Sequence, residues 1–104
     1  MSNIPAPIDA ATTPEWAALQ RHHDELDINL KKWFADDPKR VEKLSFDLAD
    51  LHFDLSKNLV TDETVKLLVN LGRAVRLEER RDAMYAGEHI NTTEDRAVLH
   101  TALR

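Results

Sequence analysis

The sequence predicts a mainly α-helical fold with one short β-hairpin. Apolar residues recur at three- and four-residue steps over most of the chain, which is the helical period. Between Ser45 and Leu55 the period changes to two, which is typical of strands. The chain has 104 residues, 42% of them hydrophobic, so it can form one small domain with a modest core.

Residues 1–13 combine Pro, Ala and small polar residues without any periodicity, and we expect them to form a flexible arm. A helix is then predicted from Thr12-Thr13-Pro14-Glu15, because Pro is tolerated in the first turn. The apolar stripe that follows fits either one long helix or two short helices that meet near Asp27. Its residues are Trp16, Leu19, His23, Leu26, Leu30 and Trp33.

Asp36-Asp37-Pro38 ends this segment, and Asp37 can cap a further short helix from Pro38 to Leu44. Two short strands are predicted next, because apolar and polar residues alternate there. The apolar positions are Phe46, Leu48, Leu51, Phe53 and Leu55. Ala49-Asp50 is a poor hairpin turn, since it lacks Gly or Asn.

Thr61-Asp62-Glu63 predicts the start of the next helix. Its apolar residues cover more than one face, so we expect burial on several sides. They are Val65, Leu67, Leu68, Val69, Leu71, Ala74, Val75 and Leu77. Gly72 weakens this helix by ~1 kcal/mol relative to Ala unless close packing requires it. A charged helix from Glu78 to Ala86 should end at Gly87, which adopts the left-handed conformation easily.

A last helix is predicted after a cap in which either Asn91 pairs with Glu94 or Thr92 pairs with Asp95. Val98, Leu99, Ala102 and Leu103 give this helix an apolar face. No Gly, Asn or Pro ends it before Arg104, so we expect a truncated piece of a longer protein.

The composition argues against several classes of function. The formal net charge of -5 gives no general attraction for nucleic acid or an anionic membrane. The chain has no cysteine, which removes disulfides and thiolate metal sites. We find no signal-peptide pattern and no long apolar run, so we expect a soluble cytoplasmic protein.

Individual residues give few candidates for chemistry. His22 and His23 are adjacent on a helix and point ~100° apart, so they do not converge on one metal ion. Lys57 fits a Schiff-base or phosphate-binding lysine, but we favour a structural turn, because Ser and Asn on either side routinely satisfy backbone groups. Among the 19 Asp and Glu residues, no pair stands out as an acid and a base.

Two blocks carry a resemblance to a known family. Residues 87–104, GEHINTTEDRAVLHTALR, resemble the signature region of the phosphoglucose isomerase family, which typically reads GE-x-IN-x-TE-x-RAVLH-x-ALR. Asp54-Leu55-Ser56-Lys57-Asn58 is similar to that family's Asp-aromatic-Ser-Lys-Asn block. The likeness extends over roughly residues 14–104. Leu55 departs from the usual aromatic residue, and Gly72 stands where Ala is expected.

The resemblance implies that residues 14–104 are the N-terminal helical segment of a larger α/β protein with two sugar-isomerase-type sandwich domains. It implies a homodimer that interconverts glucose 6-phosphate and fructose 6-phosphate in glycolysis and gluconeogenesis, without a metal or organic cofactor. The family's catalytic residues lie downstream of Arg104, so none is assigned here. We expect this stretch alone to be structural and inactive. The alternative is a stand-alone helical protein-interaction module without catalysis.

Arg96, His100 and Arg104 recur at i, i+4 and i+8 and form a basic stripe on the predicted last helix. The stripe fits an anion site or a docking face. It also fits a polar helix surface whose exposed ion pairs contribute only ~0–1 kcal/mol. We favour docking against downstream parts of the longer protein over ligand binding, because the apolar face on the other side lets both faces be engaged at once.

Arg96→Lys and His100→Gln in the full-length protein test this interpretation of the basic stripe. Docking predicts a lower melting temperature, because lysine cannot reproduce the forked hydrogen bonds of arginine. The Michaelis constant for glucose 6-phosphate should stay nearly unchanged. A large rise in that constant at an unaltered melting temperature would show that the stripe contacts the substrate phosphate.

Overall fold

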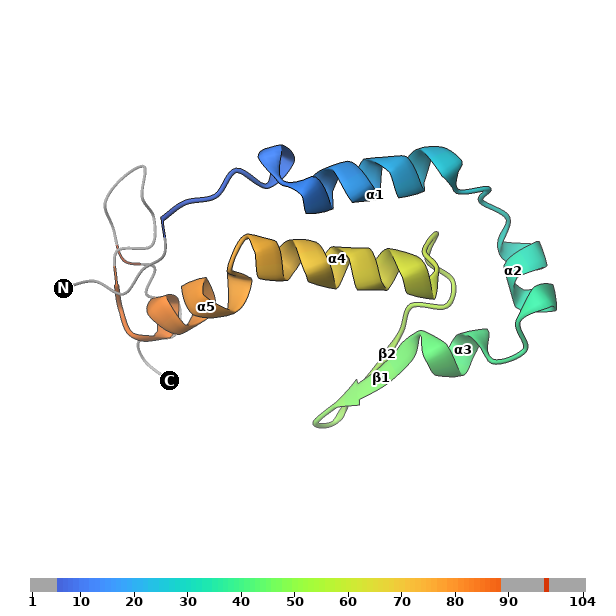
Figure 1. Ribbon diagram of the computed structural model, residues 1–104. Coiled ribbons are helices and arrows are strands. Elements are labelled where there is room, and N and C mark those ends of the chain that lie inside the picture. Colours follow the sequence, from blue (N-terminus) through green and yellow to red (C-terminus); the bar gives the residue numbers. More distant parts are fainter. Residues whose placement is uncertain (1–5, 89–96, 98–104) are drawn as a thin grey trace. The chain divides into compact units, whose positions relative to one another are not determined.

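The computed structural model describes residues 6–88 and Ala97 (Figure 1). In these residues the chain forms five α-helices, one 3₁₀ helix and one two-stranded antiparallel sheet, which confirms the predicted mainly helical fold with a hairpin. The chain divides into two compact units, Ala18–Leu68 and Met1–Ala17 together with Val69–Arg104. The predicted last helix, with its cap and basic stripe, lies outside the described residues.

The first helices begin at side-chain caps. Asp9 accepts a hydrogen bond from the amide of Ala11 and starts the 3₁₀ helix η1, Ala10–Thr12, which the sequence did not predict. Thr13 then caps helix α1, Pro14–Glu25, because its hydroxyl oxygen accepts the amide of Trp16 at 3.1 Å. Pro14 is the first helical residue, as predicted.

Of the two alternatives for the first apolar stripe, two separate helices are correct. The chain leaves the helical conformation between Glu25 and Leu30, and helix α2 spans Leu30–Asp36. The side-chain oxygen of Asn29 caps α2 by accepting the amide of Lys32 at 3.1 Å. The cap begins a new helix at Leu30, so one continuous apolar pattern in the sequence covers two separate helices.

Helix α3, Arg40–Lys43, is shorter than the helix predicted from Pro38 to Leu44. Asp37 still organises its start, because one carboxyl oxygen accepts the amide of Lys39 at 3.0 Å. The other oxygen accepts a hydrogen bond from the Lys43 ammonium at 2.8 Å.

The predicted hairpin consists of strands β1, Ser45–Leu48, and β2, Leu51–Asp54. Their antiparallel register pairs Phe46 with Phe53 and Leu48 with Leu51 on one face. The two phenylalanine rings stack with centroids 4.9 Å apart. Ala49 in the turn has a φ of 53°, which is unusual for a residue with a Cβ, so the poor turn chemistry of Ala49-Asp50 appears as local backbone strain.

Helix α4 spans Asp62–Ala74, and helix α5 spans Leu77–Tyr85. The sequence predicted a helix that runs through Leu77, but Arg76 adopts the left-handed conformation, with a φ of 61°, and separates the two. The boundary predicted between Leu77 and Glu78 lies close to this joint, although no Gly or Asn marks its position. The expected burial of α4 on several sides was wrong for the described structure, in which none of its residues is buried and Leu68 is 50% exposed.

Helix α5 ends as Gly87 predicts. Gly87 has a φ of 78°, and its amide donates to the carbonyl of Met84 at 3.1 Å. The amide of Glu88 donates to the carbonyl of Ala83 at 3.1 Å. Together these two bonds form a Schellman motif, which satisfies carbonyl groups at the end of the helix.

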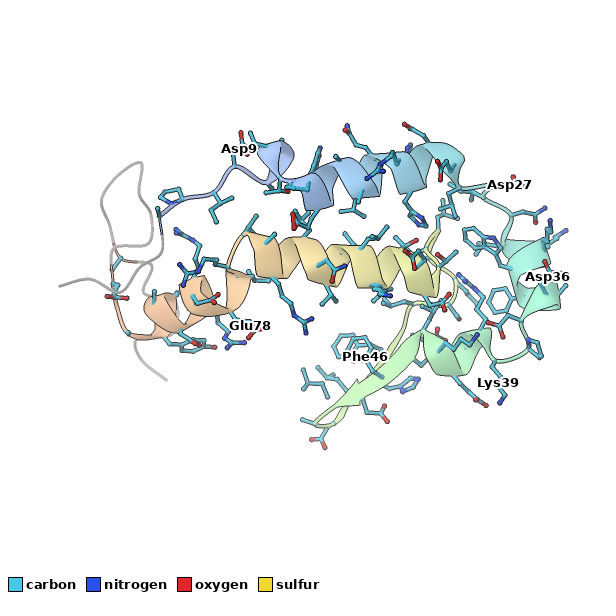
Figure 2. The ribbon with its side chains drawn as sticks, in the orientation of Figure 1. Asp9, Asp27, Asp36, Lys39, Phe46 and Glu78 are labelled. Carbon is cyan, nitrogen blue, oxygen red and sulfur yellow. The ribbon has the colours of Figure 1, made fainter. Side chains whose placement is uncertain are left out.

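Few of the described residues are fully buried, and some of those are polar. Leu44 and Ala83 are the buried apolar residues, while Arg40 and Ser56 are the buried polar ones. Many large apolar side chains remain exposed, Phe46 among them, whose ring stands out from the hairpin in Figure 2. None of the described helices combines the length and the apolar character needed to span a bilayer.

The two glycines should respond in opposite directions to substitution by Ala. A Cβ on Gly72 would meet only Leu77 Cδ2, at an ordinary 3.7 Å, so Gly72→Ala should stabilise α4 by up to about 1 kcal/mol. Gly87→Ala should destabilise the protein by about 1–2 kcal/mol, because its positive φ disfavours any Cβ. Denaturant unfolding of both variants checks this, and a loss of stability in Gly72→Ala would show that the helix needs glycine there.

Candidate functional site

A buried arginine lies at the centre of the unit Ala18–Leu68. Arg40 begins α3 and is only 5% exposed. Its Nε donates to the carbonyl of Ser56 at 2.9 Å, and its Nη2 donates to the carbonyls of Asn58 and Val60 at 3.1 and 2.9 Å. These charge-assisted bonds hold the loop between β2 and α4, which we call the Arg40-bound loop, residues 55–61.

Two aromatic residues of α2 complete the surroundings of the guanidinium. The Arg40 Cζ atom lies 5.0 Å from the ring centroid of Trp33 and 5.4 Å from that of Phe34. A cation at this distance is attracted by the ring face, and the attraction increases when water is excluded. The charge of Arg40 is therefore stabilised by carbonyl dipoles and ring faces, and within the described residues its guanidinium donates to no carboxylate.

Backbone hydrogen bonds fix both ends of the Arg40-bound loop. The amide of Leu55 donates to the carbonyl of Leu44 at 2.9 Å, and the amide of Asn58 donates to the carbonyl of Leu55 at 3.0 Å. At the other end, Thr61 and Thr64 accept each other's amides through their hydroxyl oxygens, at 3.0 and 3.3 Å. This reciprocal capping arrangement starts α4.

Asp54 and Ser56 form the turn that the Asp-x-Ser-Lys-Asn block encodes. A carboxyl oxygen of Asp54 accepts the amide of Ser56 at 2.7 Å, and Ser56 is only 1% exposed. Hydrogen bonds from the hydroxyl and then the amide of Ser56 lower the pKa of Asp54 below its ordinary value. The predicted structural turn is therefore correct, although the carboxylate of Asp54, rather than Asn58, satisfies the backbone amide.

Lys57 is exposed on this turn, and no hydrogen bond or ion pair joins its ammonium to the residues that the structure describes. A Schiff-base lysine needs an amine that is shielded from water. An exposed position does not provide that environment, so the geometry supports the structural interpretation of this block.

The two adjacent histidines point to different partners, as the helical spacing predicts. His22 is half-buried, and its Nε2 lies 2.6 Å from the hydroxyl of Thr64 at the start of α4. His23 is exposed and lies 3.5 Å from Asp24. Within residues 6–88 and Ala97, no three His, Asp or Glu side chains are grouped as a metal site requires.

Beside His22 lies a hollow of about 340 Å³. Its lining includes one arginine and two glutamates along with apolar residues: Ala18, Arg21, His22, Glu25, Glu63 and Leu67. The lining carries charges of both signs, so it does not select a ligand of one charge. Arg96, His100 and Arg104 lie outside the described residues, and their stripe remains a prediction.

Sequence reasoning missed Arg40, although one signal was present. Arg40 and Leu44 are four residues apart in a short helix, so they lie on the same face. Leu44 is the apolar residue of this segment that is best suited to burial. An arginine on the same helix face is therefore also directed towards the protein interior. The sequence did not indicate which carbonyl groups it would reach.

Arg40→Lys should lower the free energy of unfolding by at least about 1.5–3 kcal/mol, the contribution of one hydrogen bond to a charged group. A lysine ammonium is a compact charge, so it cannot reproduce the planar fork with which Arg40 donates to three carbonyl oxygens while it lies against two aromatic rings. The matched control is Arg81→Lys, because Arg81 pairs with Asp82 at the surface and should contribute under ~1 kcal/mol. Equal denaturation midpoints for the two variants would contradict the central role of Arg40.

Ser56→Ala should raise the pKa of Asp54 towards the ordinary 3.8, because the hydroxyl is the strongest cause of the shift. In the wild type the lowered pKa stabilises the folded state above pH 3.8, and this stabilisation is lost as the pH falls through the folded-state value. Carbon-13 NMR titration of the Asp54 carboxyl measures the change. Ser45→Ala is the control, because the Ser45 hydroxyl is buried without a hydrogen-bond partner in the described structure. An Asp54 titration that is identical in wild type and Ser56→Ala would refute this assignment.

Comparison with known proteins agrees with the two sequence blocks. The family model for phosphoglucose isomerase matches residues 54–104, a range that begins at Asp54 of the turn described above. Glucose-6-phosphate isomerase of Bifidobacterium longum (strain NCC 2705) is 67% identical over 97% of this chain, which corresponds to 18% of the relative.

Two mycobacterial relatives match the whole chain. Glucose-6-phosphate isomerase of Mycobacterium tuberculosis (strain ATCC 25177 / H37Ra) is 55% identical over 100% of the chain and 19% of the relative. That of Mycobacterium avium (strain 104) is 52% identical over the same shares. The chain thus spans less than a fifth of the length of these relatives. From the family match and these identities, we conclude that the chain belongs to the phosphoglucose isomerase family and matches the N-terminal portion of its members.

Proposed function

We propose that the full-length protein containing this stretch catalyses the reversible isomerisation of glucose 6-phosphate to fructose 6-phosphate. The observation that carries the proposal is the identity of 52–67% over nearly the entire chain with proteins named glucose-6-phosphate isomerase. At such identity the relatives share the same local structure, so a shared role of this stretch in the same kind of protein is the simplest account.

Within that protein, residues 1–104 supply structure and no catalytic group. The support is that several polar side chains of the described residues already make structural hydrogen bonds. Arg40 binds backbone carbonyls, Asp54 accepts an amide, and His22 contacts a helix cap. A general acid or base must instead be free to reach a substrate proton.

The proposal also includes a cytoplasmic homodimer that works without a metal or organic cofactor. Its support is the resemblance to the family. The basic stripe of Arg96, His100 and Arg104 belongs to the same proposal, as a docking face for downstream parts of the protein.

The competing function is a stand-alone interaction module, and one observation favours it. The apolar face of the hairpin is exposed, with Leu48 63% and Leu51 61% accessible, and exposed apolar faces often bind other proteins. Reading the gene beyond codon 104 separates the two functions. A stop codon there supports the module, whereas several hundred further codons support the isomerase.

A coupled assay on the full-length protein tests the proposal. We expect the full-length protein to interconvert fructose 6-phosphate and glucose 6-phosphate. Residues 1–104 alone should show no turnover, because we recognise no acid–base pair and no phosphate-binding motif in their sequence. A full-length protein that is folded by circular dichroism and inactive would reject the isomerase function. Turnover by the fragment that disappears in a point variant of the fragment would reject the structural role.

A further inference from the structure

The hairpin separates apolar from polar side chains with strict alternation. Phe46, Leu48, Leu51 and Phe53 share one face, which we call the hairpin apolar face. The opposite face pairs Ser45 with Asp54 and Asp47 with His52. The carboxylate of Asp47 lies 2.6 Å from Nδ1 of His52, so these two side chains satisfy each other on the polar face. The Ser45 hydroxyl on the same face is buried without a hydrogen-bond partner in the described structure.

The hairpin apolar face is exposed in the described structure. Its residues are between 37% and 63% accessible, although the two phenylalanine rings stack on each other. A two-stranded hairpin is at best marginally stable in water when its apolar face is not covered. The regular register of this hairpin therefore indicates a surface that is built to be covered.

The size and charge of the face distinguish three kinds of cover: a second copy, a membrane and the rest of the same polypeptide. The face offers roughly 400 Å² of exposed apolar side chain, about half of what each partner of a stable protein complex buries. A second copy of this stretch meeting it face to face would therefore bury too little. An anionic membrane is disfavoured as well, because Asp47, Asp50 and Asp54 flank the face in a chain of net charge -5.

Of these three covers, an apolar surface of the same polypeptide fits the size and charge of the face. In the relatives, the stretch that matches this chain makes up only 18–19% of the length, so more than four-fifths of such a protein is available to cover the hairpin. An intramolecular contact needs less area than association between separate molecules, because the two surfaces are already linked and lose less freedom on contact.

We propose that the hairpin apolar face packs against an apolar surface formed by the part of the full-length protein outside residues 1–104. This inference rests on the proposed function, since it requires a protein of the relatives' length. Leu48 and Leu51 are then interior residues of the full-length fold, while Asp47 and His52, their neighbours on the polar face, stay accessible to solvent.

Cysteine labelling in the full-length protein tests the proposal. The variants Leu48→Cys and Leu51→Cys probe the apolar face, and Asp47→Cys and His52→Cys are matched controls one residue away on the polar face. Since this stretch has no cysteine of its own, maleimide modification can be followed by mass spectrometry on the peptide that carries the substitution. Labelling of the two apolar-face variants should be at least about tenfold slower than that of their controls, and all four rates should converge in denaturant.

Equal native-state rates on both faces would overturn the proposal. Protection that disappears when the protein is diluted to a monomer would overturn it as well, because the cover would then be a second subunit. Isomerase activity measured on the same preparations separates the two claims. An active protein with equal labelling rates rejects only the packing, whereas an inactive protein with a protected apolar face rejects only the isomerase function.

Discussion

The unit Ala18–Leu68 depends on one buried guanidinium. Arg40 connects three parts of the chain, because its own helix α3 carries it, α2 provides the ring faces, and the Arg40-bound loop provides three carbonyl oxygens. Since Leu44 is the buried apolar residue of this unit, apolar burial alone contributes little there. Directional bonds to a charge replace part of the missing apolar core, and they define the conformation of a loop that contains no regular structure.

The exposed apolar residues and the relatives' length fit one physical account. Short helices and a two-stranded hairpin bury few side chains on their own, and small chains gain little stability from burial. The hairpin shows this most clearly, since Asp47 and His52 pair on its polar face while its apolar face stays exposed. A stretch that is less than a fifth of its relatives can keep such faces, because its stability need not come from its own core.

Local signals in the sequence predicted the elements well, because their causes are local. Thr13-Pro14, Ala49-Asp50 and Gly87 each affect the structure through the conformation or caps of a few residues. Two features could not be predicted in the same way. The exact position of the joint at Arg76 is not marked by Gly or Asn, and the contacts of Arg40 join residues 16 to 20 positions apart. Such contacts depend on tertiary packing, which neither the apolar periodicity nor a helix-capping residue indicates.

The central claim is that Arg40 holds the loop between β2 and α4. Hydrogen–deuterium exchange of the full-length protein, wild type against Arg40→Lys, measures this most directly, because it reports each segment separately. The account predicts faster amide exchange in residues 55–61 of the variant, while residues 77–85 of α5 keep their wild-type rates. Unchanged exchange in residues 55–61 of a folded Arg40→Lys protein would contradict it.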